Sequence, residues 1–293
     1  MKKLCLAFVL IGLLFPSVGR ADQLKQDIEK AVPSSNLFMN LSKDANSLYL
    51  TINNFRNLLT DYLNKSDSEF YKKNPQFATT KAKTNHIVQQ MWTVNMIDTY
   101  REVTARMENA MDKCTRKKQC MTAQEKYDLL NYLSSPVKTF NGTFDLRDFL
   151  HKNLSLCEHK PSIVNITEAF LDDLDAAAFE KDIHSFRENV ASYLDGLNSE
   201  FYKNNPQLAT KEAQVNFISQ MLVINVIDKY DDINTNLSDY DRTMFLRLLN
   251  APLGKQKFIL SDFWKQYGTR CGHHQSITSK VNAFMEEVEK AAK

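Results

Sequence analysis

The chain has 293 residues, with 37 Lys and Arg against 35 Asp and Glu, and only 7 glycines. This length is enough for a full hydrophobic core and roughly two domains, and the near-neutral charge gives no support for binding to nucleic acid or to an anionic membrane. The scarcity of glycine argues against a fold built on tight hairpins and favours helices.

The first residues have the layout of a secretory signal peptide of bacterial style. Lys2 and Lys3 precede an apolar run, Leu4–Phe15, and the small residues Gly19 and Ala21 then form a plausible cleavage site. The apolar run is too short to anchor the chain in a bilayer, and no later stretch is apolar enough to do so. We therefore expect cleavage after Ala21 and export to the periplasm or the extracellular space. The mature chain would carry 34 basic and 35 acidic residues.

Beyond the leader, apolar residues recur every three or four positions, which is the pattern of amphipathic helices. Ile52, Phe55 and Leu59 illustrate it within the stretch 36–64. The pattern predicts helices over residues 36–64, 80–111, 123–134, 146–156 and 162–195. Ser162 is the expected N-cap of the last of these. The fold class is therefore predicted to be all-α.

An internal repeat is evident. Residues 68–78, SEFYKKNPQFA, match residues 199–209, SEFYKNNPQLA, at an offset of 131. One extra threonine, Thr79 or Thr80, would then shift the offset to 130. Further matches in the same order pair Asn95–Tyr100 with Asn225–Tyr230, and Cys157–His159 with Cys271–His273. A domain-sized period of this kind indicates two tandem copies rather than a solenoid.

The repeat defines the expected organisation of the chain. A signal peptide covers residues 1–21, a first unit covers 22–161 and a second covers 162–293. Each unit should contain two long helices and two or three shorter ones. A long shared helix near residues 162–195 would join the units, and an extra loop at 108–121 distinguishes the first.

The extra loop has two cysteines and a basic centre. Cys114 and Cys120 flank Arg116, Lys117 and Lys118. In an oxidising compartment a disulfide is the default expectation for such a pair. The loop is then either a contact for an acidic protein partner or a solvated turn whose bridge limits fraying.

The repeated segment combines acidic, aromatic and basic residues. Its candidate interaction residues are Glu69, Phe70 and Tyr71 in the first copy and Glu200, Phe201 and Tyr202 in the second. Turn chemistry offers a simpler explanation, and we favour it: Asn-Pro ends a helical turn, the two aromatic residues fill the gap between two long helices, and a threonine caps the next helix.

Matching Cys-x-His pairs occur once in each copy. Cys157 with His159, and Cys271 with His273, could together supply the four ligands of a tetrahedral zinc site. The spacing is not that of common zinc modules. The alternatives are a Cys157–Cys271 disulfide joining the copies, or two buried thiols, and we favour these over zinc.

No common catalytic motif is present in the sequence. Asp98 and Asp228 occupy matching positions and could form a carboxylate pair, although an exposed helix position beside basic residues is a simpler role. The leading hypothesis is an exported, non-catalytic interaction protein with a protein partner and no cofactor. The second is a binder of a small ligand, in an interhelical pocket, or of a metal. The third is an all-helical hydrolase or transferase.

Overall fold

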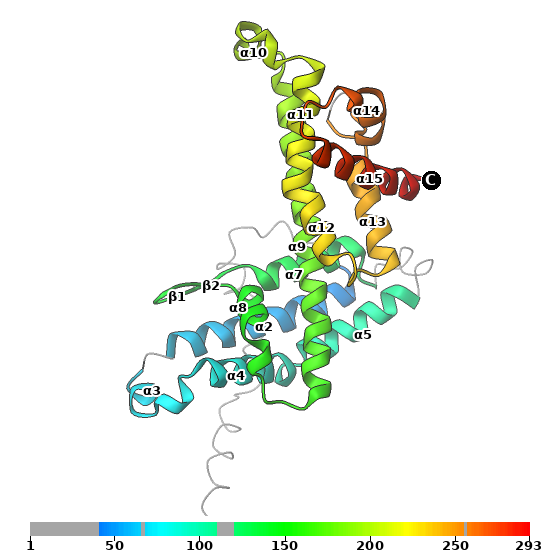
Figure 1. The fold of residues 1–293 in the computed structure, drawn as a ribbon. Coiled ribbons are helices and arrows are strands. Elements are labelled where there is room, and N and C mark those ends of the chain that lie inside the picture. Colours follow the sequence, from blue (N-terminus) through cyan, green and yellow to red (C-terminus); the bar gives the residue numbers. More distant parts are fainter. Residues whose placement is uncertain (1–40, 66–67, 110–119, 255–256) are drawn as a thin grey trace, which may run out of the picture. The chain divides into compact units, whose positions relative to one another are not determined.

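Helices dominate the part of the chain that the computed structural model describes, which comprises residues 41–65, 68–109, 120–254 and 257–293 (Figure 1). The prediction of a mostly helical protein is confirmed over these ranges. The expected signal peptide, residues 1–21, lies outside them, as do Cys114 and the three basic residues of the extra loop.

The elements follow one another with short connections. The first group is α2 (Lys43–Lys65), α3 (Glu69–Lys73), the 3₁₀ turn η2 (Pro75–Phe77), α4 (Thr80–Thr93), α5 (Met96–Asn109), α7 (Ala123–Ser134), β1 (Val137–Thr139), β2 (Gly142–Phe144), α8 (Leu146–Asn153) and η3 (Leu154–Leu156). The second group is α9 (Pro161–Gly196), α10 (Glu200–Asn204), η4 (Pro206–Leu208), α11 (Lys211–Leu222), the π-turn η5 (Val223–Ile227), α12 (Asp228–Ile233), α13 (Asp239–Asn250), α14 (Leu260–Tyr267), η6 (Gly268–Arg270) and α15 (Gln275–Ala292).

Helix α2 buries the predicted stripe. Ile52 and Phe55 have no exposed surface and Leu59 is 3% exposed, because α2 packs against α5 and α7. One carboxylate fixes two helix starts at this contact. Glu125 closes a capping box with Thr122 at the start of α7 and also accepts the backbone N–H of Ser42, at 2.7 Å, just before α2.

The prediction of a single helix over residues 80–111 is wrong. The structure has two helices, α4 and α5, separated at Asn95, whose φ of 58° lies in the left-handed region. Asparagine adopts this region more readily than most residues, so neither glycine nor proline is needed to end α4. In the second half of the chain the corresponding stretch stays helical through the π-turn η5.

The structure also shows that the one-residue shift between the two repeated segments was placed too early in the sequence alignment. Thr79 and Thr210 each cap a helix, at the same offset of 131 as the segments before them. Asn85 and Asn216, which follow them, make the same contacts and keep that offset. The extra residue of the first segment therefore lies after Asn85, toward the break at Asn95, and is neither Thr79 nor Thr80.

Helix α9 is continuous over 36 residues, as predicted, which corresponds to about 50 Å at 1.5 Å per residue. Its N-cap is Lys160, with Pro161 at the first helical position, and not Ser162 as expected. Proline suits that position because its missing N–H would have no partner there. The helix packs against α7 and α8 from the first part of the chain and against α12 and α13 from the second.

A short antiparallel hairpin was not predicted. β1 pairs with β2, with Val137 opposite Phe144. The turn holds Asn141 followed by Gly142 at a φ of +124°, and Asn-Gly is a strong hairpin signal that the overall scarcity of glycine obscured. Phe140 at this turn is 86% exposed.

Within the described ranges, no helix combines the length and the apolar composition that crossing a membrane requires.

Candidate functional site

The repeated segment folds into a short protruding turn that we call aromatic tip 1, residues 68–78. Helix α3 ends at Asn74, whose side-chain amide donates to the carbonyl of Phe70 at 2.8 Å. Pro75 then starts η2, and the hydroxyl of Thr79 accepts the N–H of Ala82 at 3.1 Å to cap α4. The predicted Asn-Pro turn and threonine cap are both present in the structure.

The aromatic residues of tip 1 do not both fill a gap between helices. Tyr71 is half-buried and its ring meets that of Tyr62 edge-on at 6.3 Å. Phe70, however, is 57% exposed and lies nearly parallel to Phe77, which is 50% exposed, with the ring centroids 6.0 Å apart. The gap-filling prediction is therefore wrong for Phe70, and an apolar pair faces solvent.

Aromatic tip 2, residues 199–209, has the same construction. The amide of Asn205 donates to the carbonyl of Phe201 at 2.8 Å, and the ring of Tyr202 meets that of Tyr193 edge-on at 6.0 Å. Phe201 is 57% exposed and Leu208 is 43% exposed. An exposed apolar pair thus occurs in both tips, although Phe77 and Leu208 were absent from the residues predicted from sequence.

Each tip rests on a stacked ring pair. Tyr62 stacks on His86 with centroids 3.9 Å apart, and Tyr193 stacks on Phe217 at 4.0 Å. Partial burial lowers the pKa of His86 below its ordinary value, so the imidazole is neutral near pH 7 and can substitute for an apolar ring. Beside tip 1 a shallow cavity of about 220 Å³ is lined by Tyr62, Phe70, Tyr71, Phe77, Ala82 and His86.

The polar residues of the tips pair with each other. Glu69 and Lys72 form an exposed ion pair at 3.4 Å, and Glu200 and Lys203 form one at the same distance. Exposed pairs of this kind contribute little to stability. The predicted interaction residues Glu69 and Glu200 therefore balance a local lysine, and they leave the apolar pair as the distinctive feature of each tip.

The structure places the two Cys-x-His pairs on separate loops, each bonded to a different helix. The Nε2 of His159 donates to the carbonyl of Asn85 at 2.9 Å, and that of His273 donates to the carbonyl of Asn216 at 2.8 Å. Among the described residues, no three His, Cys, Asp or Glu side chains come together as a metal ion would require. Cys157 and Cys271 are free thiols, so the disulfide between them is not formed, and both are half-buried rather than buried. Each arm instead fastens a loop to its own helix, α4 or α11.

The matched aspartates are also separate. Asp228 forms an ion pair with Lys280 at 2.6 Å, and Asp98 is an exposed residue of α5. Across the described ranges no hydrogen bond joins the two, and both occupy exposed helix positions, which is the role we favoured over a carboxylate pair. Cys114, Arg116, Lys117 and Lys118 lie outside those ranges, and the role of their loop stays a prediction.

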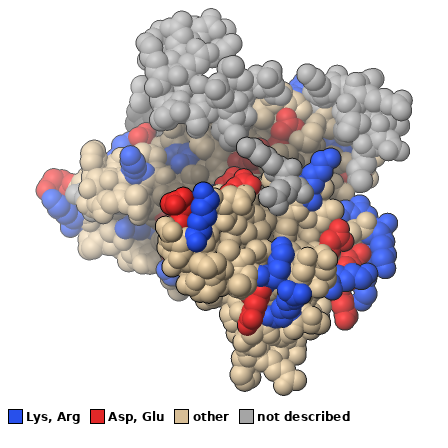
Figure 2. Space-filling view, turned by 90° about the horizontal axis from the view of Figure 1, so that it is seen from above, with Lys and Arg blue, Asp and Glu red and all other residues tan. Residues whose placement is uncertain are grey.

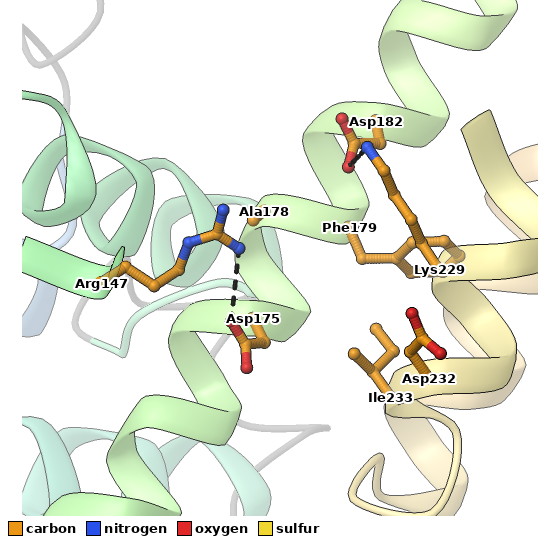
Figure 3. Close-up of a pocket in the computed structure, with 8 residues that line it drawn as sticks. All are labelled: Arg147, Asp175, Ala178, Phe179, Asp182, Lys229, Asp232 and Ile233. Carbon is orange, nitrogen blue, oxygen red and sulfur yellow. Dashed lines mark hydrogen bonds and ion pairs between the residues drawn. The ribbon is translucent and has the colours of Figure 1, made fainter. Parts of the chain in front are cut away.

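A cavity of about 240 Å³ lies between α8, α9 and α12, as Figure 3 shows. Most of its charged residues are paired: Arg147 and the neighbouring His151 approach Asp175 at 3.3 and 2.9 Å, and Lys229 contacts Asp182 at 2.6 Å, whereas Asp232 forms no ion pair within the described ranges. Such mutual pairing leaves these ions poorly placed to act on a substrate. Sequence reasoning missed this cluster because its residues come from three separate helices.

Charge on the visible surface is mixed. Figure 2 shows lysine and arginine interspersed with aspartate and glutamate, with no large area of one sign on that face. This agrees with the near-equal totals of basic and acidic residues and again gives no support for nucleic-acid binding.

No protein-family model matches the chain, and no curated protein and no solved structure matches it either.

Proposed function

We propose that this chain is an exported, non-catalytic helical protein that captures a protein partner through aromatic tips 1 and 2. One observation carries the proposal. Each tip holds two large apolar side chains that are 43% to 57% exposed, on a turn that its own hydrogen bonds make rigid. Exposed apolar groups arranged together on a surface are typical of protein contact sites.

The energetic argument follows from this exposure. Removing a large apolar side chain such as Phe70 or Phe201 from water contributes about 1.5–3 kcal/mol when burial is complete. In the free protein that contribution is only partly realised, because about half of each side chain remains in water. A partner that covers a tip would gain the remainder without reordering the turn. Two tips on one chain would also raise avidity for a partner with two equivalent sites.

We also infer that the chain arose by duplication of one helical unit. The repeated sequence supports this, and so do contacts that recur at matching positions. Arg56 donates to three carbonyls at the end of α7, while Arg187 donates to the corresponding carbonyls at the end of α13. Duplication explains why one chain presents the same apolar tip twice.

Export and the bridged loop belong to the same proposal. The leader with cleavage at Ala21 would deliver the protein to an oxidising compartment, where Cys114 and Cys120 would form the disulfide of the extra loop. Arg116 and Lys117 would then offer a basic contact in addition to the two apolar ones. The proposal needs no cofactor.

Site-specific photo-crosslinking in the protein's own export compartment tests the proposal. A photoreactive phenylalanine replaces Phe70 or Phe201, and the matched control carries it at Phe140, which is 86% exposed but belongs to the hairpin turn. We expect one protein adduct common to both tips and absent from the control. Equal labelling at the control position, or adducts to lipid alone, would contradict the proposal.

A further inference from the structure

A second cavity, distinct from the tips, lies where α5, α7, α9 and the start of α13 meet. It encloses about 220 Å³ and most of its lining is polar. The residues that line it are Tyr100, Thr104, Glu108, Lys126, Ala169, Asp172, Asp173, Asn236, Ser238 and Asp241. Both halves of the chain contribute, so the cavity exists once although the helical unit recurs.

The charged groups of this cavity are carried by a buried network with an excess of acid. Lys126, whose side chain is 7% exposed, lies 3.3 Å from Asp173 and 3.8 Å from Asp241. Asp241 also accepts hydrogen bonds from the hydroxyls of Tyr127 and Ser238. One ammonium group thus faces two carboxylates.

Asp172 adds a further carboxyl group to the same wall. Burial raises its pKa above the ordinary value, and the neighbouring Asp175 and Asp173 raise it further. Among the described residues that line the cavity, Lys126 is the only lysine and none is an arginine, so this part of the lining is short of positive charge.

One polar atom in this cavity has no well-formed hydrogen bond. Tyr100 is 3% exposed, and although the carboxylate of Asp173 lies near its hydroxyl, no hydrogen bond of normal geometry joins the hydroxyl to that carboxylate or to any other described group. Burial raises the pKa of this phenol, and the carboxylates of Asp173 and Asp241 add to the effect, so the group is a neutral hydroxyl. A buried hydroxyl without a partner is uncommon because it has lost its hydrogen bonds to water.

The matching tyrosine shows that the fold does not force this arrangement. Tyr230, which corresponds to Tyr100 in the repeat, donates its hydroxyl to Glu287 at 3.1 Å. Only the tyrosine that lines the cavity is left unsatisfied. A missing partner at this one position, inside a cavity with excess acid, points to a ligand that is present when the protein works.

We propose that the cavity binds a small aliphatic amine in its ammonium form. The ammonium group would donate to the oxygen of Tyr100 and to the carboxylate of Asp173, and its charge would offset the excess of acid. At about 30 Å³ per water molecule, a cavity of about 220 Å³ has room for a molecule of the size of ethanolamine or a short diamine. A metal ion is a poorer match, because no three metal-ligating side chains come together among the described residues.

Isothermal titration of the full chain with ethanolamine and with 1,4-diaminobutane tests the inference. Succinate serves as a probe of similar size and opposite charge. We expect at least one amine to bind with a stoichiometry of one, and succinate not to bind. Failure of both amines to bind, or equal binding of succinate, would overturn the inference.

Two single-atom variants make the test specific. Tyr100→Phe removes the unpartnered hydroxyl and should weaken amine binding about ten-fold, the loss expected for one hydrogen bond to a charged group. The matched control is Tyr230→Phe, which removes the corresponding hydroxyl outside the cavity and should leave the affinity unchanged. Unaltered affinity in Tyr100→Phe, or an equal loss in both variants, would count against the assigned site. Neither result bears on the aromatic tips.

Discussion

The two arginines that end α7 and α13 allow a quantitative test of how the helices are held together. The Nη1 of Arg56 donates to the carbonyls of Tyr132 and Leu133 at 2.8 Å each and to that of Ser135 at 2.6 Å. These carbonyls lie where a helix has no N–H of its own to satisfy them and where its dipole is negative. A cation at this place both satisfies the carbonyls and offsets the dipole.

Replacing Arg56 by methionine keeps most of the apolar stem and removes the donors. A hydrogen bond from a charged group contributes about 1.5–3 kcal/mol. The three bonds share one nitrogen and are not additive, so we expect a loss of about 3 kcal/mol in the free energy of unfolding. Arg187→Met should cost a similar amount, because Arg187 donates to Leu248, Leu249 and Ala251 at 2.7, 3.0 and 2.6 Å.

Urea unfolding followed by circular dichroism measures both losses. The matched control is Arg101→Met on the exposed face of α5, where substitution should change stability by less than about 0.5 kcal/mol. Arg56→Lys should recover only part of the loss, because one ammonium group cannot reproduce the planar donor geometry of the guanidinium. A loss below about 1 kcal/mol in either methionine variant would refute the reasoning.

Three further predictions concern the tips and the cavity. Burial lowers the pKa of His86 below 6.5, so the native state binds fewer protons than the unfolded state, and the free energy of unfolding should fall as the pH drops below about 6.5. His86→Phe should flatten that dependence in urea titrations between about pH 5 and pH 7, and an unchanged slope would exclude His86 as its cause. Tyr100→Phe should raise the free energy of unfolding by up to about 1 kcal/mol, since an unpaired buried hydroxyl is removed, whereas Tyr230→Phe should lower it by about 1 kcal/mol; the same sign in both would contradict the assignment. Phe70→Ser should leave the melting temperature nearly unchanged, and a large drop would mean that this residue belongs to the core.

The helices that a continuous apolar stripe defines could be predicted from the sequence. Helix α2 and the 36-residue helix α9 both show the expected buried face. The break at Asn95 could not, because its signal is one asparagine in the left-handed region and the apolar pattern continues across it. The alignment of the repeat was misled in the same region, because the sequence placed the one-residue shift at Thr79 or Thr80, which the matching contacts of Asn85 and Asn216 exclude.

The two tips could be located from the sequence because the segment repeats, but the exposure of their apolar side chains could not be predicted. Phe70 was expected to be buried, since large apolar residues usually lie inside. What exposes it is the local turn, in which Asn74 bonds back to the carbonyl of Phe70 and Pro75 starts a new 3₁₀ turn. The residues of the polar cavity gave no signal at all. Lys126, Asp173 and Asp241 are far apart in the chain and meet only through the packing of three helices.

The contrast between the tips and the cavity bears on what the proposed duplication can produce. A feature contained within one unit, such as the turn that exposes Phe70, recurs at Phe201 with the same exposure and the same internal hydrogen bond. A feature formed where two units meet cannot recur, because there is only one such contact in the chain. Helix α9 packs against α7 from the first half and against α13 from the second half. Tyr100 and Tyr230 illustrate the consequence. They occupy matching positions of the repeat, but Tyr100 lines the cavity, whereas the hydroxyl of Tyr230 donates to Glu287. Bivalent binding at the tips would therefore be a direct product of duplication, whereas an amine site could arise only after the two halves had packed together and diverged.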